Sequence, residues 1–491
     1  MRIDEVILSP KENPFSILDK EELYDKERIK QEAENLRVLL SDVNPGDRVA
    51  IIIDNSVEYI ISLMAVSSLQ ATAVLIEPNT PVQAMLDYLE AAKVSFVITT
   101  EKINTRLPKK FIGGKSLGDT PYIQISKSYG DKLEDVETDE AFILFSSGTT
   151  GVAKGIILTH AAVIQNISSI IAYMHPTPKD TFYITRTMVY VSSLIGEVLV
   201  ALLAGSKLVI SNPKNSPRTT LSLIEKHKVT IIGVNPTILN LLIKASYLGT
   251  IDLSCVRSVY VSGSVAKKEI LMEAQKVFNT AGVFNVYGLT EAGFRVSAQR
   301  EDGFNEYGSV GVPIDGVQIK ISNDQGLECA PLQSGEVYVK TPSVMKGYLN
   351  NSTLTKEKIV DGWLKTNDEG YVDEQGQLFV LGRKDDMINR DGFNIDPLHI
   401  ENVINKYEGV KECIVFATSD EKVEQKVICA YVRSDSHSGE LNAKVINQFC
   451  QSYLKQIEIP SIAIEWDYIP RTHTGKVSRY LAKERYLKER L

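Results

Sequence analysis

The sequence predicts a mixed α/β protein with a large amino-terminal body of α/β subdomains plus a distorted β-barrel, and a small, mobile α+β carboxyl-terminal domain. Two observations support this prediction. Through the first half, apolar runs rich in β-branched residues alternate with helical patterns, which favours a largely parallel sheet. After about Gly308, short strands are separated by Gly, Asp and Asn, which favours a twisted antiparallel sheet or a distorted barrel.

The individual elements follow from local patterning. Arg48–Ile53 is an apolar run typical of a buried strand, Val57–Leu69 is typical of a helix, and Ala71–Ile76 is a second strand. The same alternation predicts further strands in four later runs, at Val94–Thr99, Lys207–Ile210, Val229–Val234 and Val256–Val261.

The later part of the chain divides into two segments. Short strands are expected at Val317–Ile321, Gly335–Lys340, Gly370–Val372 and Gln377–Leu381. The polar stretch Gly382–Asp396 then leads into a compact α+β segment that ends in a charged helix, Ser478–Leu491. We therefore expect a boundary near residue 385, with a large domain over residues 1–384 and a small domain over residues 385–491.

Composition and charge exclude several classes of protein. The 491 residues are 43% hydrophobic and 24% charged, as in ordinary globular proteins, and the net charge of −8 argues against a nucleic-acid partner. The most apolar region, Leu194–Ile210, is interrupted by Glu197 and Lys207 and is too short to span a membrane. Five scattered cysteines without a CxxC pair, and an amino terminus without a signal pattern, predict a cytoplasmic protein.

The densest candidate chemistry follows an apolar strand, Ala141–Phe145. The run Ser146-Ser147-Gly148-Thr149-Thr150-Gly151, with Lys154 close behind it, combines hydroxyl side chains, glycines and a cation. Glycines let backbone N–H groups converge on an anion, hydroxyls add donors and lysine adds positive charge, as a triphosphate requires. The spacing is not that of a Walker A loop. A flexible surface loop is the alternative that composition alone allows.

A second pattern is Asn285-Val286-Tyr287-Gly288-Leu289-Thr290-Glu291. It combines an aromatic ring that can stack on a base, a hydroxyl for a phosphate oxygen and a carboxylate for Mg²⁺. The structural alternative is a strand end followed by a helix that Thr290 caps.

Four further patterns follow, each open to a plain structural interpretation as a turn or a solvated charge. They are Val261-Ser262-Gly263-Ser264-Val265, Gly362-Trp363-Leu364-Lys365-Thr366-Asn367-Asp368, Leu381-Gly382-Arg383-Lys384-Asp385-Asp386, and Ile469–Val477, which contains Gly475-Lys476.

Taken in order, these patterns resemble the motifs of the adenylate-forming (AMP-binding) superfamily, which includes acyl- and aryl-CoA synthetases, luciferase-like ligases and nonribosomal adenylation domains. The resemblance covers the chain from residue 145 to residue 477. It departs from the family pattern at Ala153, where proline is usual, at Ser262 and Val265 in the adenine-pocket turn, and at Asn367, where glycine is usual.

The resemblance implies a role for each matching residue. Residues Ser146 to Gly151 and Lys154 hold phosphates. Gly263, Ser264, Asn285 and Gly288 line the nucleotide pocket, and Tyr287 stacks on adenine. Thr290 binds the α-phosphate, Glu291 binds Mg²⁺, Asp368 accepts from the ribose hydroxyls, and Arg383 contacts the ribose or the α-phosphate. Asp385 is the hinge and Lys476 is the catalytic lysine of the small lid domain.

The implied reaction is ATP-dependent activation of a carboxylic acid to acyl-AMP, with release of pyrophosphate and transfer to the thiol of CoA. A separate carrier protein bearing phosphopantetheine is the alternative acceptor, and a non-catalytic nucleotide-binding regulator is the alternative of another class. The acyl pocket is expected to include Tyr190 and Gly263. Glu197 is the one nearby carboxylate that leaves an amino acid substrate open.

Overall fold

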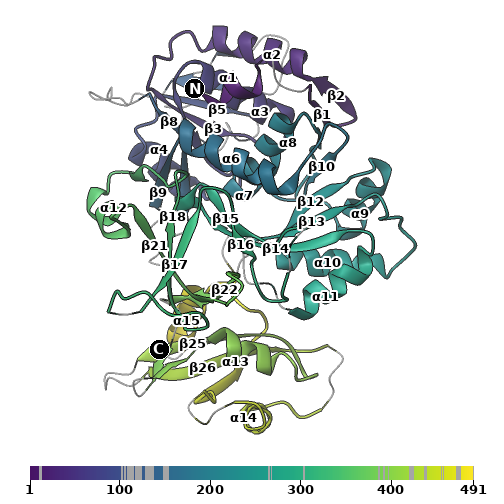
Figure 1. The fold of residues 1–491 in the computed structure, drawn as a ribbon, viewed down its shortest axis with the longest axis vertical. Coiled ribbons are helices and arrows are strands. Elements are labelled where there is room, and N and C mark those ends of the chain that lie inside the picture. The colour runs from purple at the N-terminus through teal and green to yellow at the C-terminus, as the bar shows by residue number, and fades with distance from the viewer. Residues whose placement is uncertain are drawn as a thin grey trace.

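The structure is a computed structural model of the 491-residue chain (Figure 1). It describes residues 1–489 apart from 10–13, 101–102, 104–106, 108–114, 117–123, 128–137, 147–153, 264–265, 267, 302, 304, 324, 385–387, 391–392, 396, 420–424, 436–438, 455, 457 and 472–476.

One sheet of the body contains eight strands in the order β19-β9-β8-β4-β3-β5-β7-β6. Strands β8, β4, β3 and β5 are parallel to one another, and β9 and β7 pair antiparallel to the two sides of this group. The edge strands β19 and β6 pair antiparallel to β9 and β7. The strands are β3 (Arg48–Ile52), β4 (Thr72–Leu75), β5 (Phe96–Thr99), β6 (Lys115–Ser116), β7 (Gln124–Lys127), β8 (Glu140–Ser146), β9 (Lys154–Thr159) and β19 (Gly347–Tyr348). The predicted strands at residues 48–53, 71–76 and 94–99 are confirmed.

A second sheet contains nine strands in the order β16-β15-β14-β13-β12-β10-β11-β1-β2, and the strands from β1 to β14 along this order are parallel. The strands are β1 (Ser16–Asp19), β2 (Glu22–Asp25), β10 (Thr181–Ile184), β11 (Lys207–Val209), β12 (Ile231–Val234), β13 (Ser258–Val261), β14 (Gly282–Leu289), β15 (Phe294–Ala298) and β16 (Val312–Pro313). The apolar runs rich in β-branched residues therefore predicted the parallel strands of this sheet correctly.

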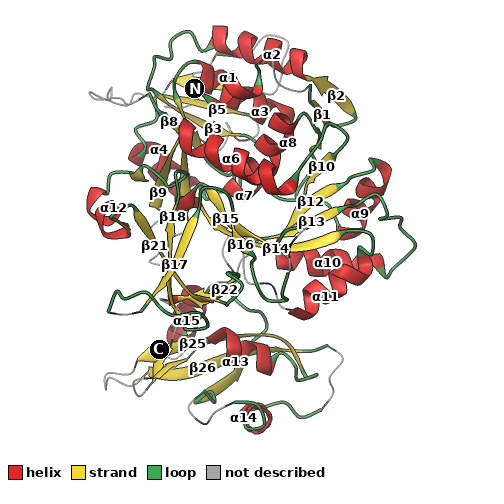
Figure 2. Cartoon of the chain, viewed as in Figure 1, coloured by secondary structure: helices red, strands yellow, loops and turns green. Residues whose placement is uncertain are grey.

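Helices cover both sheets (Figure 2). The α6 helix contacts β8 and β9 of one sheet and β15 of the other, so it joins the two sheets in one core. The helices of the body are α1 (Ile3–Ile7), α2 (Lys26–Leu39), α3 (Val57–Ser68), α4 (Val82–Ala91), α6 (His160–Met174), α7 (Val191–Ser193), the π-helix η2 (Leu194–Leu199), α8 (Val200–Ala204), α9 (Pro217–Lys226), α10 (Pro236–Ser246), α11 (Lys268–Val277), the 3₁₀-helix η3 (Thr290–Ala292) and α12 (Ser352–Lys358).

The third sheet of the body is antiparallel, as the short, punctuated strands predicted. Its order is β17-β18-β21-β20, with β22 paired to β21, and no pairing among the described strands closes it into a ring. The strands are β17 (Gln318–Ser322), β18 (Gly335–Lys340), β20 (Ile359–Val360), β21 (Trp363–Val372) and β22 (Leu378–Arg383). The mixed α/β fold class is confirmed.

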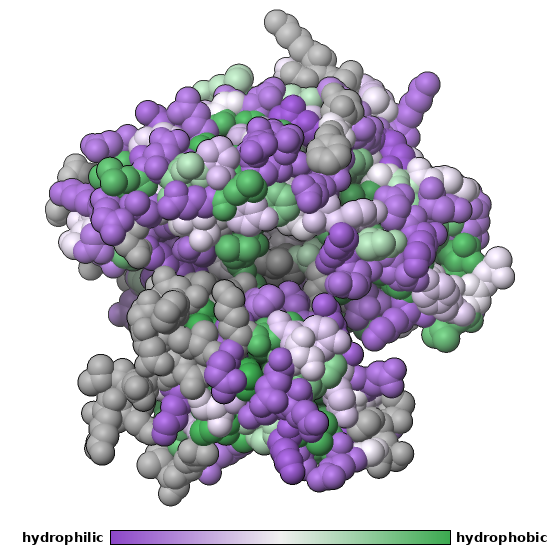
Figure 3. All heavy atoms as spheres, turned by 60° about the horizontal axis from the view of Figure 1, so that its bottom comes forward, coloured by the Kyte–Doolittle hydropathy of each residue, from purple (hydrophilic) through white to green (hydrophobic). Residues whose placement is uncertain are grey.

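The last part of the chain forms a smaller mass beside the body (Figure 3). Two clusters of buried side chains, all from residue 388 onward, make its core. Its elements are β23 (Ile388–Arg390), β24 (Phe393–Ile395), α13 (Pro397–Ile404), β25 (Val410–Ser419), β26 (Gln425–Arg433), α14 (Ala443–Cys450), β27 (Ile462–Glu465) and α15 (Arg479–Lys488). None of the described helices has the length and apolar character needed to cross a bilayer.

Candidate active site

Polar side chains from separate elements of the body meet near the end of β14. The hydroxyl of Tyr348 donates to Glu291 Oε1 at 3.0 Å, and Lys154 Nζ lies 5.9 Å from the centre of the Tyr348 ring. These contacts bring the cation that follows the predicted phosphate loop close to the carboxylate predicted to bind Mg²⁺. Burial and the neighbouring Glu291 carboxylate raise the pKa of Tyr348, so its hydroxyl remains a hydrogen-bond donor.

Asp368 is the centre of the second half of this cluster. Arg383 Nη1 donates to Asp368 Oδ1 at 3.1 Å, and the Tyr287 hydroxyl donates to Oδ2. Burial raises the pKa of Asp368, and the adjacent guanidinium opposes that rise. Both carboxylate oxygens already have protein partners, so a ribose must share their remaining lone pairs or displace a partner.

The six residues Lys154, Tyr348, Glu291, Arg383, Asp368 and Tyr287 are called the nucleotide cluster below. Burial disfavours the charged form of Arg383, but the carboxylates of Asp368 and Glu291 outweigh burial and raise its pKa. That electrostatic coupling connects the two halves of the cluster. An amine, a guanidinium, two carboxylates and an aromatic ring in one place are typical of a nucleotide site.

Two backbone features explain the residue types around the cluster. A Cβ at Gly288 would lie 1.7 Å from the carbonyl oxygen of Phe294, so β15 can approach β14 only where that position is glycine. Asn367 has φ of 65°, a left-handed conformation that asparagine tolerates better than most residues. The replacement of the usual glycine by Asn367 therefore keeps the backbone conformation of this turn.

The predicted helix-cap alternative for Thr290 is wrong. Leu289 occupies the N-cap position of η3, no side chain caps it, and Thr290 is the first helical residue. The Thr290 hydroxyl is therefore not used as a cap.

Two other predicted pocket residues differ in their surroundings. Asn285 is buried, and its side-chain amide donates to the Ser309 carbonyl at 3.0 Å, so it also ties β14 to the following loop. Gly263 has φ of +94°, and among the described residues a Cβ there would meet only Asn235 Cβ, at 4.0 Å.

Several predicted site residues lie outside the described part of the structure. They are Ser147, Gly148, Thr149, Thr150, Gly151, Ser264, Asp385 and Lys476, together with the side chain of Ser146. Two backbone pairings flank these residues. Ser146 of β8 pairs with Lys154 of β9, and Arg471 pairs with Val477.

The predicted acyl side of the site contains a buried salt bridge. Glu197 Oε1 accepts from Arg186 Nη2, and Arg186 Nη1 donates to Ser262 Oγ at 3.2 Å. Burial raises the pKa of Glu197, and Arg186 opposes that rise. Because Arg186 already pairs with it, Glu197 is a poor receptor for the ammonium group of an amino acid. Tyr190 donates from its hydroxyl to Glu77 Oε2 at 2.7 Å.

Sequence reasoning missed Tyr348, Arg186 and Arg295, which the structure brings to this region. Tyr348 follows a glycine in an ordinary surface-like stretch, so no local signal pairs it with Glu291. Arg295 lies in the alternating run Phe294–Ala298, where alternation alone predicts an exposed side chain. Only the burial of Arg295 marks it as unusual, and that burial is visible only in the folded structure.

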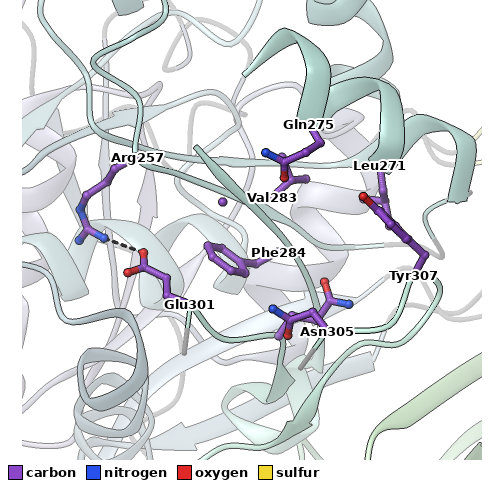
Figure 4. A pocket seen from close by; sticks show the side chains of 10 residues that line it. Arg257, Leu271, Gln275, Val283, Phe284, Glu301, Asn305 and Tyr307 are labelled. Carbon is purple, nitrogen blue, oxygen red and sulfur yellow. Dashed lines mark hydrogen bonds and ion pairs between the residues drawn. The ribbon is translucent and has the colours of Figure 1, made fainter. Parts of the chain in front are cut away.

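A hollow of about 470 Å³ lies elsewhere, near the start of β14 (Figure 4). Its walls include the Arg257–Glu301 ion pair, with a distance of 2.9 Å between Arg257 Nη1 and Glu301 Oε1. It contains none of the predicted site residues, which lie at the other end of β14. This hollow is therefore separate from the nucleotide cluster.

The residues of the nucleotide cluster fit ATP with Mg²⁺. Among the described residues, no group of three or more His, Cys, Asp or Glu side chains could hold a metal on its own. Mg²⁺ bound to a nucleotide needs only one or two protein carboxylates, because phosphate oxygens and water supply the other ligands. Glu291 can supply one carboxylate, since the only hydrogen bond to its side chain within the described residues is at Oε1.

The fold and the cluster define a nucleotide-binding α/β enzyme. The family described as "AMP-binding enzyme" matches residues 26–349, and "AMP-binding enzyme C-terminal domain" matches residues 399–476. The chain belongs to the AMP-binding enzyme family. The predicted adenylate-forming family and the predicted class of AMP-forming acid–thiol ligase are confirmed.

Individual relatives extend over nearly the whole chain. The oxalate–CoA ligase of Arabidopsis thaliana is 28% identical over 92% of this chain and 91% of its own. The 2-succinylbenzoate–CoA ligase of Listeria monocytogenes is 28% identical over 98% of both. The long-chain-fatty-acid–CoA ligase of Yersinia pestis is 30% identical over 80% of this chain and 70% of its own.

Solved structures show the same fold. The o-succinylbenzoate CoA synthetase of Bacillus subtilis, in complex with its acyl-adenylate intermediate, has a TM-score of 0.85 at 25% identity and covers 98% of this chain and 97% of its own. ATP-bound MatB of Rhodopseudomonas palustris has a TM-score of 0.87 at 23% identity over 99% of both chains, which is a likeness of fold alone.

Proposed function

We propose that the nucleotide cluster binds ATP with Mg²⁺, activates a carboxylic acid as its acyl-AMP, and that CoA then accepts the acyl group. The observation that carries this proposal is the assembly of Lys154, Glu291 and Asp368, together with their contact residues, from distant parts of the chain. The relatives that extend over nearly the whole chain are CoA ligases by name, which supports CoA as the acceptor.

Each residue of the cluster has a distinct task in this proposal. Lys154 and the loop Ser146–Gly151 hold the terminal phosphates, the Tyr287 ring stacks on adenine, and Asp368 with Arg383 holds the ribose. Glu291 holds Mg²⁺, which neutralises charge on the phosphates when bound. Thr290 donates to an oxygen of the α-phosphate.

The first half-reaction forms a mixed anhydride. A carboxylate oxygen of the acid attacks the α-phosphorus in line, and the bond to pyrophosphate breaks. Lys476, on the small domain, approaches both the attacking oxygen and the α-phosphate and stabilises the negative charge that develops there.

The second half-reaction transfers the acyl group to sulfur. The CoA thiolate attacks the acyl carbon and AMP leaves with the bonding electron pair. We infer that residues 385–491 rotate about Asp385 between the two steps, which withdraws Lys476 and admits the thiol. We also place the enzyme in the cytoplasm, where the thiols of its five cysteines remain reduced.

The test of this function is pyrophosphate release with ATP and a panel of fatty, aryl, dicarboxylic and amino acids. Thioester formation is then compared between CoA and a panel of holo-carrier proteins. We expect release with at least one acid and thioester with CoA. Thioester formation with a carrier protein alone would make the chain a loading enzyme. No pyrophosphate release with any acid of the panel would favour a nucleotide-binding regulator.

The two domains are tested separately. We expect Lys476→Ala to abolish acid-dependent pyrophosphate exchange while it spares the reaction of supplied acyl-AMP with CoA. Equal loss of both half-reactions contradicts the role of Lys476. Asp385→Pro restricts the backbone at the hinge, so it is expected to slow thioester formation more than adenylation; normal rates of both steps contradict the hinge.

A further inference from the structure

Arg295 is a charged residue in the interior of the body. It lies in β15 with 3% of its surface exposed, and no ion pair or carboxylate contact is found for it within the described residues. Its Nη1 donates to the Tyr173 hydroxyl, and its Nε has no hydrogen-bond partner within the described structure. Burial lowers the pKa of Arg295 to about 9, which still leaves the guanidinium protonated at neutral pH.

Aromatic rings surround this guanidinium but do not neutralise it. The Arg295 Cζ atom lies 4.8 Å from the ring centre of Phe294, 5.6 Å from that of Tyr173 and 5.8 Å from that of Tyr260. Ring faces attract a cation and replace part of its lost hydration. A buried charge is nevertheless normally paired with an opposite charge, and the part of the chain that the structure describes offers Arg295 no such partner.

The position of Arg295 relates it to the reacting end of the site. It pairs with Gly288 across β14 and β15, so the two Cα atoms are about 5 Å apart. Gly288 lies between Tyr287 and Thr290 in the nucleotide motif, and η3, which carries Thr290 and Glu291, contacts β15. The α7 and η2 helices, which follow Tyr190, contact β15 as well. Arg295 therefore lies on a strand that contacts both the adenylating groups and the helices that follow Tyr190.

Another buried cation of this region is already matched. Arg186 and Glu197 form a salt bridge with each other, over the backbone of Gly233, where a Cβ would lie 2.2 Å from Glu197 Oε1. Arg295 differs from Arg186 because no carboxylate that contacts its guanidinium is found within the described residues.

We propose that Arg295 binds a second carboxylate on the acid, so that the substrates of this enzyme are dicarboxylic acids. One carboxylate is adenylated near Thr290, and the other pairs with Arg295 inside the acyl pocket. The aromatic rings around the guanidinium shape the pocket and exclude water, which strengthens the pairing. This inference rests on the proposed function and names the class of acid for it.

The test compares matched acids on the full-length enzyme. Straight-chain dicarboxylic acids from oxalic to suberic acid, and phthalic acid, are each assayed against the monocarboxylic acid of the same carbon skeleton. The readout is kcat/KM in pyrophosphate release. We expect the wild type to prefer the dicarboxylate in at least one pair.

Variants then assign that preference to the guanidinium. Arg295→Gln is expected to lower kcat/KM for the preferred dicarboxylate by about 10- to 100-fold, since it removes a charged hydrogen bond. The kcat/KM for the matched monocarboxylate should stay the same or rise. Arg295→Lys keeps the charge and should retain part of the preference. Arg300→Gln, a partly exposed arginine just beyond β15, serves as the control and should keep the wild-type ratio.

A binding measurement separates recognition from turnover. The preferred dicarboxylate should raise the Tm of the wild type and not that of Arg295→Gln, because a ligand stabilises only the fold that binds it. A purely structural role for Arg295 predicts equal losses for both acids of a pair, and that result overturns the proposal.

The outcomes also distinguish this proposal from the function on which it rests. Activation of monocarboxylic acids without any preference for dicarboxylates overturns the role of Arg295 and leaves the ligase function intact. The absence of pyrophosphate release and of CoA thioester with every acid overturns both.

Discussion

The nucleotide cluster and the acyl region differ in how they treat charge. In the nucleotide cluster, Asp368, Arg383 and Tyr287 form a set of mutual hydrogen bonds before any ligand is present. In the acyl region, Arg186 and Glu197 pair with each other, but no carboxylate contacts Arg295 within the described structure. Both Arg295 and Arg383 have an Nε without a hydrogen-bond partner there, so the difference lies in the carboxylate that Arg383 has and Arg295 lacks.

The two regions are therefore prepared for their ligands in different ways. Paired groups hold their geometry but must exchange partners when a ribose binds. An unpaired buried cation is costly in the free protein and gains most from an anionic ligand. We therefore expect the nucleotide cluster to determine rate and ATP binding, and the acyl region to determine stability and the choice of acid.

The largest effect on stability is expected from breaking the buried salt bridge. Arg186→Met leaves Glu197 unpaired in the interior and should lower the free energy of unfolding by about 3–5 kcal/mol. Arg186→Met combined with Glu197→Met removes both charges and should cost less than the single change. The midpoint of urea unfolding measures both.

The control for the salt bridge is the exposed pair Arg37–Glu34 on α2. Arg37→Met should leave the unfolding midpoint unchanged, because surface pairs contribute little. If the double variant at Arg186 and Glu197 were less stable than either single variant, the two side chains would be stabilising the fold as a favourable pair.

In the nucleotide cluster, Asp368→Asn removes the charge that holds Arg383. We expect kcat/KM for ATP to fall by about 10- to 100-fold, because the variant loses a charged hydrogen bond with Arg383. Steady-state kinetics with varied ATP measures this change.

The matched control is Asp373→Asn, a buried aspartate of the same β-hairpin that accepts from the N–H groups of Gln375 and Gln377. It should affect stability and leave KM for ATP unchanged; equal effects on ATP would contradict the site.

His160 shows a third way to bury an ionisable group, namely without charge. It is 5% exposed, and burial lowers its pKa from 6.5 to about 4. Between these values the unfolded chain binds more protons than the folded one, so the folded state loses stability as pH falls. Going from pH 7 to pH 5 should cost about 2 kcal/mol from this group.

The measurement is the difference in unfolding free energy between pH 7 and pH 5, for the wild type and for His160→Gln. The variant should lose about 2 kcal/mol less than the wild type over this interval. His175→Asn, at the exposed end of α6, is the control and should behave as the wild type does. A wild type and a His160→Gln variant with the same pH dependence would show that His160 is protonated in the fold.

The smallest effect is expected at Tyr348. Tyr348→Phe removes the hydrogen bond to Glu291 Oε1 and leaves the ring beside Lys154. The apparent affinity for Mg²⁺ in adenylation should weaken by about 2- to 10-fold, in line with one lost hydrogen bond. Titration of pyrophosphate release with Mg²⁺ measures it. Tyr371→Phe, whose ring stacks on Phe379, is the control, and an unchanged Mg²⁺ dependence in both variants would remove Tyr348 from the site.

Much of the body could be predicted because strands and helices have local signatures. The buried strands at β3, β4 and β12 are continuous apolar runs, and the helix at α3 follows directly after one of them. The candidate site could be predicted because hydroxyls, glycines and charges occur in a characteristic order along the chain. The domain boundary near residue 385 and the roles of Lys476 and Asp385 remain predictions.

The sequence by itself determined the reaction class and predicted the residues of the nucleotide site, since each motif occupies a few consecutive positions. Only the tertiary structure decided that Tyr348 bonds to Glu291, that Arg186 neutralises Glu197, and that Arg295 is buried. The alternation in β15 predicts an exposed Arg295, but α6 covers that side of the strand, and Asn166 of α6 bonds to the Arg295 backbone. The physical reason is that burial of a charge depends on what packs against it, and those residues are distant in the chain.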